Sequence, residues 1–497
     1  AIGQVALSAD TLGSKSVAVG RGALNSQNFT TATDSHNVAM GYFAGVSVTT
    51  GVRNTLIGNS AGDALTDADR NVALGYSALG ADTLGSRSVA IGYTALNAQN
   101  FTTATDTYNT AVGYGAGALV TTGNNNTFLG ALVGDANTTG SNNTAVGRDS
   151  LGSNTTADAN TALGYGSLRD NTTGSGNVGL GYLALEENTT GGNNTAVGFQ
   201  ALEENTTAAA NTGVGYQALA ANQTGTRNVA VGYHAGLNTT TSDNTILGYA
   251  AAEAMTSGSS NIIVGSKAGQ SLTVGNNNVA IGVEALDADT KGDRNIAIGN
   301  QALSAQNFTT STDAYNVAVG HNAGLTVTTG VENTIMGGLA GDALTDSDRN
   351  VAVGHAALTS ETLGQYSTAV GYSALSSQAN STAANALNTA VGYNAGAAVT
   401  TGTVNTFVGG LSGDAYTDGA ANTAIGYEAL SADTRGHRAT AIGYRALKTQ
   451  NITTSSDSYN TAVGYDAGLS VTTGVRNTLI GGLSGDALTT GDNNVAL

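Results

Sequence analysis

One short motif recurs along this chain at an almost constant spacing, and that spacing constrains the fold more than any other feature. The motif reads Asn-[Thr or Val]-Ala-[Val, Ile or Leu]-Gly-Tyr-x-Ala-[Leu or Gly], and its glycines, from Gly3 to Gly481, are mostly 17 residues apart. A unit this short cannot hold a helical hairpin, and β-branched residues between Asn and Gly favour short strands and tight turns. The sequence therefore predicts an all-β chain, a parallel β-solenoid (β-roll or β-helix) of about 28 coils with a 17-residue period.

The exceptions to the spacing divide this solenoid into three regions. One spacing is 16 residues (Gly232 to Gly248) and five are 21 residues. Residues 1–113 and 299–497 follow a 72-residue super-repeat of three short coils and one long coil, whereas residues 114–298 form uninterrupted coils. We expect one continuous domain, and because both ends fall inside a motif, we expect it to belong to a longer chain.

The strand of each motif predicts two apolar faces. The residue before the glycine is aliphatic, as at Val19 and Ile480, and we expect it to form the interior of the coil. The residue two before the glycine is usually Ala, and where it is large the residue after the glycine is small, which we interpret as a shared packing layer. The large residues are Leu56, Phe128, Ile335, Phe407 and Leu479, and their small counterparts are Asn59, Ala131, Gly338, Gly410 and Gly482; Ile246 with Tyr249 breaks this exchange, which is a tendency. Since a solenoid needs only one buried face, the second predicts self-association of the chain.

Asn and Thr recur at fixed places in the coil. Asn begins most motifs, as at Asn37 and Asn54, and pairs of Thr lie half a coil away. We expect the Asn side chains to form hydrogen bonds along the stack and the Thr pairs to mark the opposite turn.

Composition excludes several function classes. Lys plus Arg is 17 against 35 for Asp plus Glu, and the net charge of −18 opposes binding to nucleic acid or an anionic membrane. The chain has no Cys, hence no disulfide framework, and no apolar run of about 18 residues that would span a bilayer. No nucleophile elbow, P-loop or zinc spacing occurs, and the five His never share a fixed arrangement with Ser and a carboxylate, so we do not expect an enzyme.

The long coils predict surface bulges. Four of the five share a Gln-Asn-[Phe or Ile]-Thr-Thr core, and their apolar residues are Phe29, Phe101, Phe308 and Ile452. These residues could pack over a coil edge or between subunits, because an apolar ring seldom stays exposed. Alternatively, loops on a rigid scaffold often carry recognition, and regular spacing favours avidity.

Recurring acidic turns are the only candidate metal sites. Their carboxylates are Asp63, Asp67 and Asp69, and again Asp342, Asp346 and Asp348. Oxygen-rich turns could bind calcium, although solvated turns neutralised by Arg70 or Arg349 are the alternative that we favour. No other cofactor is expected. Sequons such as Asn171-Thr172-Thr173 could accept glycans, but turn chemistry is the favoured explanation.

The motif resembles a known family. Ser86-Arg87-Ser88-Val89-Ala90-Ile91-Gly92 and Asp293-Arg294-Asn295-Ile296-Ala297-Ile298-Gly299 look like the head repeats of YadA-like trimeric autotransporter adhesins, although the coil here is longer. The resemblance implies a left-handed β-roll, a homotrimer, and a surface that binds host or matrix proteins. The string from Asn194 to Thr207 is similar to repeats of phage tail fibres.

We therefore expect a structural extracellular fibre or adhesin shaft or head that mediates surface attachment. Its location would be extracellular, on a cell surface or on a virion tail, and its partners further copies of itself and a cell-surface, matrix or glycan receptor. The alternatives are a phage or virus tail fibre, a passive surface filament, and an ice-binding solenoid, which the Thr pairs suggest.

Overall fold

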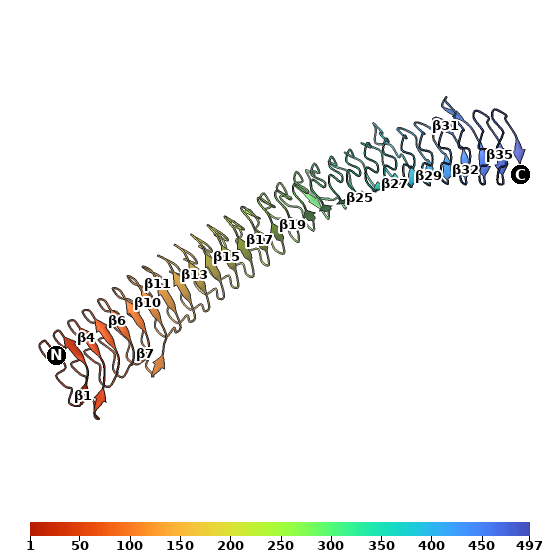
Figure 1. Cartoon of the computed structure of the whole chain (residues 1–497). Coiled ribbons are helices and arrows are strands. Elements are labelled where there is room, and N and C mark those ends of the chain that lie inside the picture. The colour runs from red at the N-terminus through yellow and green to blue at the C-terminus, as the bar shows by residue number, and fades with distance from the viewer. The chain divides into compact units, whose positions relative to one another are not determined.

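The computed structural model describes residues 1–497 and contains strands and turns but no helix. It comprises two compact units, Ala1–Asp243 and Asn244–Leu497. Within each unit, successive coils stack on one another as a parallel β-solenoid with a period of about 17 residues (Figure 1). The predicted fold class is confirmed at this level.

Most coils contribute one strand of three residues. In the first unit these strands are β2 (Val17–Val19), β4 (Val38–Met40), β5 (Thr55–Ile57), β6 (Val72–Leu74), β8 (Val89–Ile91), β10 (Thr110–Val112), β11 (Thr127–Leu129), β12 (Thr144–Val146), β13 (Thr161–Leu163), β14 (Val178–Leu180), β15 (Thr195–Val197), β16 (Thr212–Val214) and β17 (Val229–Val231). In the second unit they are β18 (Thr245–Leu247), β19 (Ile262–Val264), β20 (Val279–Ile281), β22 (Ile296–Ile298), β24 (Val317–Val319), β25 (Thr334–Met336), β26 (Val351–Val353), β27 (Thr368–Val370), β28 (Thr389–Val391), β29 (Thr406–Val408), β30 (Thr423–Ile425), β32 (Thr440–Ile442), β34 (Thr461–Val463) and β35 (Thr478–Ile480), followed by the shorter β36 (Val495–Ala496).

Equivalent residues of neighbouring coils pair directly. In β10 and β11, for example, Thr110 lies beside Thr127 and Ala111 beside Phe128 in a parallel register. We number the coil from the motif Asn as positions 1 to 17, so that Asn54 is at position 1 and the motif glycine Gly58 at position 5. Each position then forms a ladder along the stack.

The interior of the coil is the Ala ladder, not the aliphatic ladder that we expected. Position 3, as in Ala73 and Ala145, is fully buried. Position 4, before the glycine, points outward, and Leu74 is 44% exposed. The expectation was wrong because both faces of the strand are apolar and alternation alone does not tell which one faces in. Small side chains face in, since the opposite wall of the coil fills the interior with Leu at position 9, as at Leu79.

Position 9 also corrects the interpretation of the large residues at position 3. The ring of Phe128 lies against two glycines at position 9, because a Cβ added at Gly134 would be 2.6 Å from its Cε1 and one added at Gly117 would be 3.0 Å from its Cδ2. A large residue at position 3 therefore replaces the Leu of position 9. Ile246, which broke the proposed exchange with position 6, fits this one, since position 9 of its coil is Ala252.

Two positions have backbone conformations that the stack imposes. The motif glycines have φ between 125° and 150°, and a Cβ added at Gly113 would collide with the carbonyl oxygen of Gly130 in the next coil. Leu79 adopts φ 53°, which is costly for a bulky residue, and its complete burial compensates for the strain.

Buried Asn ladders connect the coils as predicted. The Oδ1 atom of Asn54 accepts a hydrogen bond from the backbone N–H of Asn71 at 2.9 Å, and its Nδ2 donates to the carbonyl of Ala68 at 2.7 Å. A second ladder occupies position 12, where Asn154 donates to Oδ1 of Asn137 at 2.7 Å. These bonds satisfy amides that would otherwise be costly to bury.

Candidate functional site

The outer face of the strand ladder runs along each unit and is exposed. Positions 2, 4 and 6 point outward, and we call them together the exposed face. Positions 2 and 4 hold only Val, Ile, Leu, Met and Thr, and many of them are more than a third exposed, including Val17, Met40, Leu129 and Ile262. Monomeric soluble proteins rarely expose a continuous apolar surface of this extent.

Aromatic rings continue the exposed face at position 6. Tyr165, Tyr182, Phe199, Tyr216 and Tyr233 stack in consecutive coils, with ring centroids 5.0 to 5.4 Å apart and planes within 15° of parallel. In the second unit, Tyr427, Tyr444 and Tyr465 stack in the same way. Because the rings cover one another's faces, they present their edges and hydroxyl groups outward.

The face is also almost free of charge. Arg21 and Arg148 are its only charged side chains, both at position 6. In a chain of net charge −18, this leaves one side of each unit on which another copy could approach without strong repulsion.

The bulges are held by buried carboxylates that the sequence reasoning missed. Asp82 lies at position 12 of the coil before a bulge and accepts hydrogen bonds from Nε2 of Gln99 (2.6 Å) and the backbone N–H groups of Phe101 (3.0 Å) and Gly85 (3.1 Å). Asp10, Asp289, Glu361 and Asp433 occupy the equivalent position before the other four bulges and also accept from a Gln side chain. The signal was an acidic residue at position 12, present only in coils before a 21-residue coil.

The apolar bulge residues lie inside the coils. Phe29, Phe101, Phe308 and Ile452 are 5 to 7% exposed. A short outer strand continues each of these bulges, as β9 (Thr105–Asp106) pairs with β7 (Gly85–Ser86). The other pairs are β1 (Gly13–Ser14) with β3 (Thr33–Asp34), β21 (Gly292–Asp293) with β23 (Thr312–Asp313), and β31 (Gly436–His437) with β33 (Ser456–Asp457). Within the first unit, β1 and β7 project from the same side of the stack (Figure 1).

An ion pair fastens the outer strand of four bulges, and in the first of them Lys15 pairs with Asp34 at 2.6 Å. Nε of Arg87 lies 2.9 Å from Oδ1 of Asp106, and its guanidinium covers the ring of Tyr108 at 5.4 Å. Arg294 and Arg438 pair in the same way with Asp313 and Asp457, and cover Tyr315 and Tyr459. What remains exposed at the tip is a run of small residues, such as Thr102 to Ala104.

The structure does not assemble the predicted calcium ligands into one site. Oδ1 of Asp67 accepts a hydrogen bond from Thr50 Oγ1 at 2.6 Å, and Oδ1 of Asp69 accepts one from the backbone N–H of Val52 at 2.8 Å, so each serves its neighbouring coil. Asp346 and Asp348 repeat these contacts with Thr329 and Val331. Asp63 and Asp342 lie at position 10, and no cluster of three potential ligands forms. Calcium binding therefore stays a prediction without a geometry to support it.

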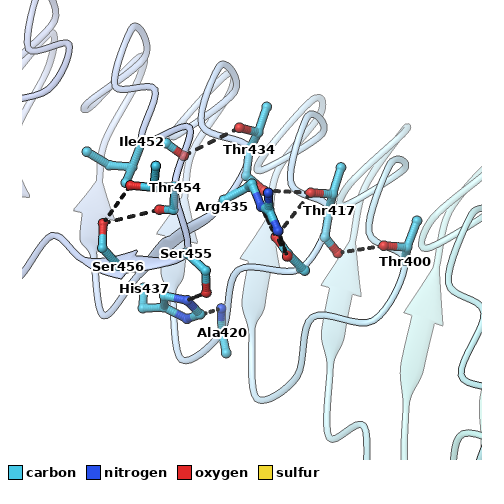
Figure 2. A network of polar contacts seen from close by, with 11 residues as sticks. Thr400, Thr417, Ala420, Thr434, Arg435, His437, Ile452, Thr454, Ser455 and Ser456 are labelled. Atoms are coloured by element: carbon cyan, nitrogen blue, oxygen red, sulfur yellow. Dashed lines mark hydrogen bonds and ion pairs between the residues drawn. The ribbon is translucent and has the colours of Figure 1, made fainter.

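One His and one Ser meet at the last bulge, a pairing that no sequence motif predicted. Nε2 of His437 lies 2.7 Å from Oγ of Ser455, and Nδ1 of the same ring accepts the backbone N–H of Ala420 at 3.0 Å (Figure 2). Since Nδ1 is an acceptor, the neutral ring carries its proton on Nε2 and donates it to Ser455. A general base needs the opposite tautomer, so this pair cannot activate the serine.

The sequons and the Thr pairs have structural roles here. Asn171 and Asn188 are fully buried, and Nδ2 of Asn171 donates to Gly174 at 2.9 Å, which leaves no accessible amide in the folded coil. The first Thr of a pair donates to the next coil, as Thr155 Oγ1 does to the carbonyl of Thr172 at 3.1 Å. Only the second Thr of each pair, such as Thr156, is exposed. The Thr pairs therefore present a single row of exposed hydroxyl groups along the stack, and not the two parallel rows that an ice-binding surface of paired threonines would need.

The chain shows no cavity. It also has no helix of the length and hydrophobicity that a bilayer crossing requires. A comparison with protein-family models finds no match, and a comparison with curated protein sequences finds none either.

Proposed function

We propose that this chain is a structural segment of an extracellular fibre or adhesin, in which several copies associate through the exposed face. The observation that carries the proposal is the continuous, apolar and nearly uncharged surface formed by positions 2, 4 and 6 in each unit. Water contact with such a face costs free energy in every coil, and burial of it in an assembly removes that cost.

The area supports this proposal. About 14 coils per unit, a rise of about 4.8 Å per coil and a width of about 13 Å from position 2 to position 6 give roughly 900 Å² per unit. A stable protein–protein interface buries about 800 Å² on each partner. One unit therefore offers enough surface for association, and a homotrimer, as the family resemblance implies, is the proposed state.

The attachment role rests on the bulges. Their tips are short, exposed and held on a rigid scaffold by buried carboxylates and ion pairs, which suits repeated weak contacts with a cell-surface, matrix or glycan receptor. A cell surface or a virion tail is the proposed location. A phage or virus tail fibre would use the same face and the same bulges.

Charged substitutions on the exposed face test the association. Sedimentation equilibrium of the chain should show an oligomer, and the variant Leu163→Glu with Leu180→Glu should be monomeric with an unchanged circular dichroism spectrum. The matched control is Thr156→Glu with Thr173→Glu, which adds the same charge to exposed residues at position 14 of neighbouring coils. A parent chain that stays monomeric at micromolar concentration would refute self-association.

A further inference from the structure

The aromatic row at position 6 is interrupted at regular intervals by small residues. In the second unit these are Ser266, Gly338, Gly410 and Gly482, and in the first unit Asn59 and Ala131; Val283 and Asn300 also lack an aromatic ring at this position. Ser266 and the three glycines are each 72 residues apart, as are Asn59 and Ala131, which corresponds to four coils. We call the three glycine positions the notches.

Nothing within the chain requires glycine at the notches. Their φ values lie outside the left-handed region. A Cβ added at Gly338 would meet nothing closer than Cδ2 of His355 at 3.6 Å, and one added at Gly410 nothing closer than Cδ2 of Tyr427 at 3.6 Å, which are ordinary van der Waals contacts. The motif glycines contrast with them, because a side chain there would collide with the next coil.

The missing side chain leaves a space of defined size on the exposed face. Tyr393 and Tyr427 flank Gly410 in the preceding and following coils. Two coils are about 9.6 Å apart along the stack. Elsewhere in the row, stacked rings are 5.0 to 5.7 Å apart, so the space between these two rings admits one further side chain of aromatic width.

A repetitive face creates a problem that the notches would solve. If all coils were identical, two copies could slide by one coil, about 4.8 Å, and recover the same contacts, so the axial register would be weakly specified. An interruption every fourth coil makes such a shifted register unfavourable, because protruding side chains of one copy would no longer meet the spaces of the other.

We propose that each notch receives a side chain from a second copy of this chain and thereby fixes the axial register of the assembly. The proposal rests on the self-association proposed above and names the residues that determine its register. Gly338 and Gly410 are the residues on which it depends most, since each lies between two ring-bearing residues at position 6.

The test fills the notches and measures register directly. Because the chain lacks Cys, a single Thr401→Cys substitution at exposed position 14 accepts one spin label per copy away from the exposed face. Pulsed electron paramagnetic resonance should give one narrow distance between labels in the parent assembly. In the variant Gly338→Tyr with Gly410→Tyr, the melting curve of the monomer should be unchanged, whereas association should weaken at least tenfold or the distance should change.

The control is Val283→Tyr, which adds the same ring at position 6 of a coil without a notch. It should keep the affinity and the label distance of the parent. Notch-filled copies that associate with the parent's affinity and distance would overturn the role of the notches while leaving self-association intact. A parent chain without any association would instead refute the proposed function, and with it the occupant of the notches.

Discussion

The negative charge of Asp414, at position 10, destabilises the folded state. Burial raises the pKa of Asp414 from 3.8 to about 6, with the nearby Glu428 adding to the effect, and Oδ1 of the side chain has no hydrogen-bond partner. The folded state therefore holds the proton more tightly than the unfolded state. The stability that protonation of Asp414 contributes is present below about pH 4 and is lost as the pH rises through 6.

Replacement of Asp414 by Asn should therefore stabilise the chain at pH 7 by about 1 kcal/mol, because it removes a partly desolvated negative charge beside Glu428, and change little at pH 4, where the carboxyl is protonated. Thermal melts at both pH values measure this difference. Asp418 is the matched control, because Arg435 lowers the pKa of Asp418 and its removal should bring no gain at pH 7. Equal effects of Asp414→Asn at both pH values would contradict the assignment.

The exchange between positions 3 and 9 is testable with a double-mutant cycle. Phe128→Ala should destabilise the first unit by about 3 to 5 kcal/mol, since it leaves a cavity above two glycines. Gly134→Leu alone should also destabilise, because Phe128 occupies the space. Together the two changes restore the common pattern of Ala at position 3 and Leu at position 9, and Leu already tolerates φ near +50° there. Denaturant unfolding should show the double variant to be more stable than either single one, and simple additivity would contradict the packing account.

At the scale of the structural element, each bulge depends on its buried carboxylate. Asp82→Ala would leave the N–H groups of Gly85 and Phe101 and the amide of Gln99 without their acceptor, at a cost of about 3 kcal/mol. Hydrogen exchange should rise in residues 99–109. Thr103→Gly at the exposed tip should leave hydrogen exchange and the melting temperature unchanged. The two variants together distinguish residues that hold the bulge in place from residues that are only exposed at its tip. Equal exchange in both would show that the carboxylate does not hold the bulge.

Some features of the strand and the coil were predictable from the sequence and others were not. The spacing of the glycines was enough to predict the coil, the strand and the bulges, because each needs a particular backbone geometry at a particular residue. Which face of the strand points into the coil was not predictable from the sequence, since the Val and Ala residues on the two faces are both apolar. The Ala face is buried because the Leu of position 9, across the coil, fills the interior. The carboxylate that holds each bulge was likewise missed, because Asp82 and Gln99 are 17 residues apart and meet only when the coils stack.

At the scale of the whole molecule, stability is a sum over neighbouring coils. Deletion of residues 160–176, one complete coil, should leave the first unit folded with a small change in melting temperature, because the flanking coils present the same ladders to each other. Deletion of residues 174–176 alone should be far more damaging, since the shortened coil would lose the turn at positions 15 to 17 and its contacts, such as the hydrogen bond from Asn160 Nδ2 to the carbonyl of Gly174 at 2.9 Å. Circular dichroism melts compare the two deletions, and equal loss of structure would contradict the stacking account.

The direction of the hydrogen bonds between coils has a mechanical consequence. The backbone groups that join neighbouring coils, such as Val38 N–H to the carbonyl of Asn54 at 2.8 Å, point along the stack, so the interfaces carry a force along a unit in series and open one at a time, the weakest first. Each coil that detaches would release about 50 Å of chain, from 17 residues at about 3.3 Å each less the rise that the coil occupied. A single unit pulled in an optical trap should therefore lengthen in many small, evenly spaced steps at low tension and act as an extensible tether.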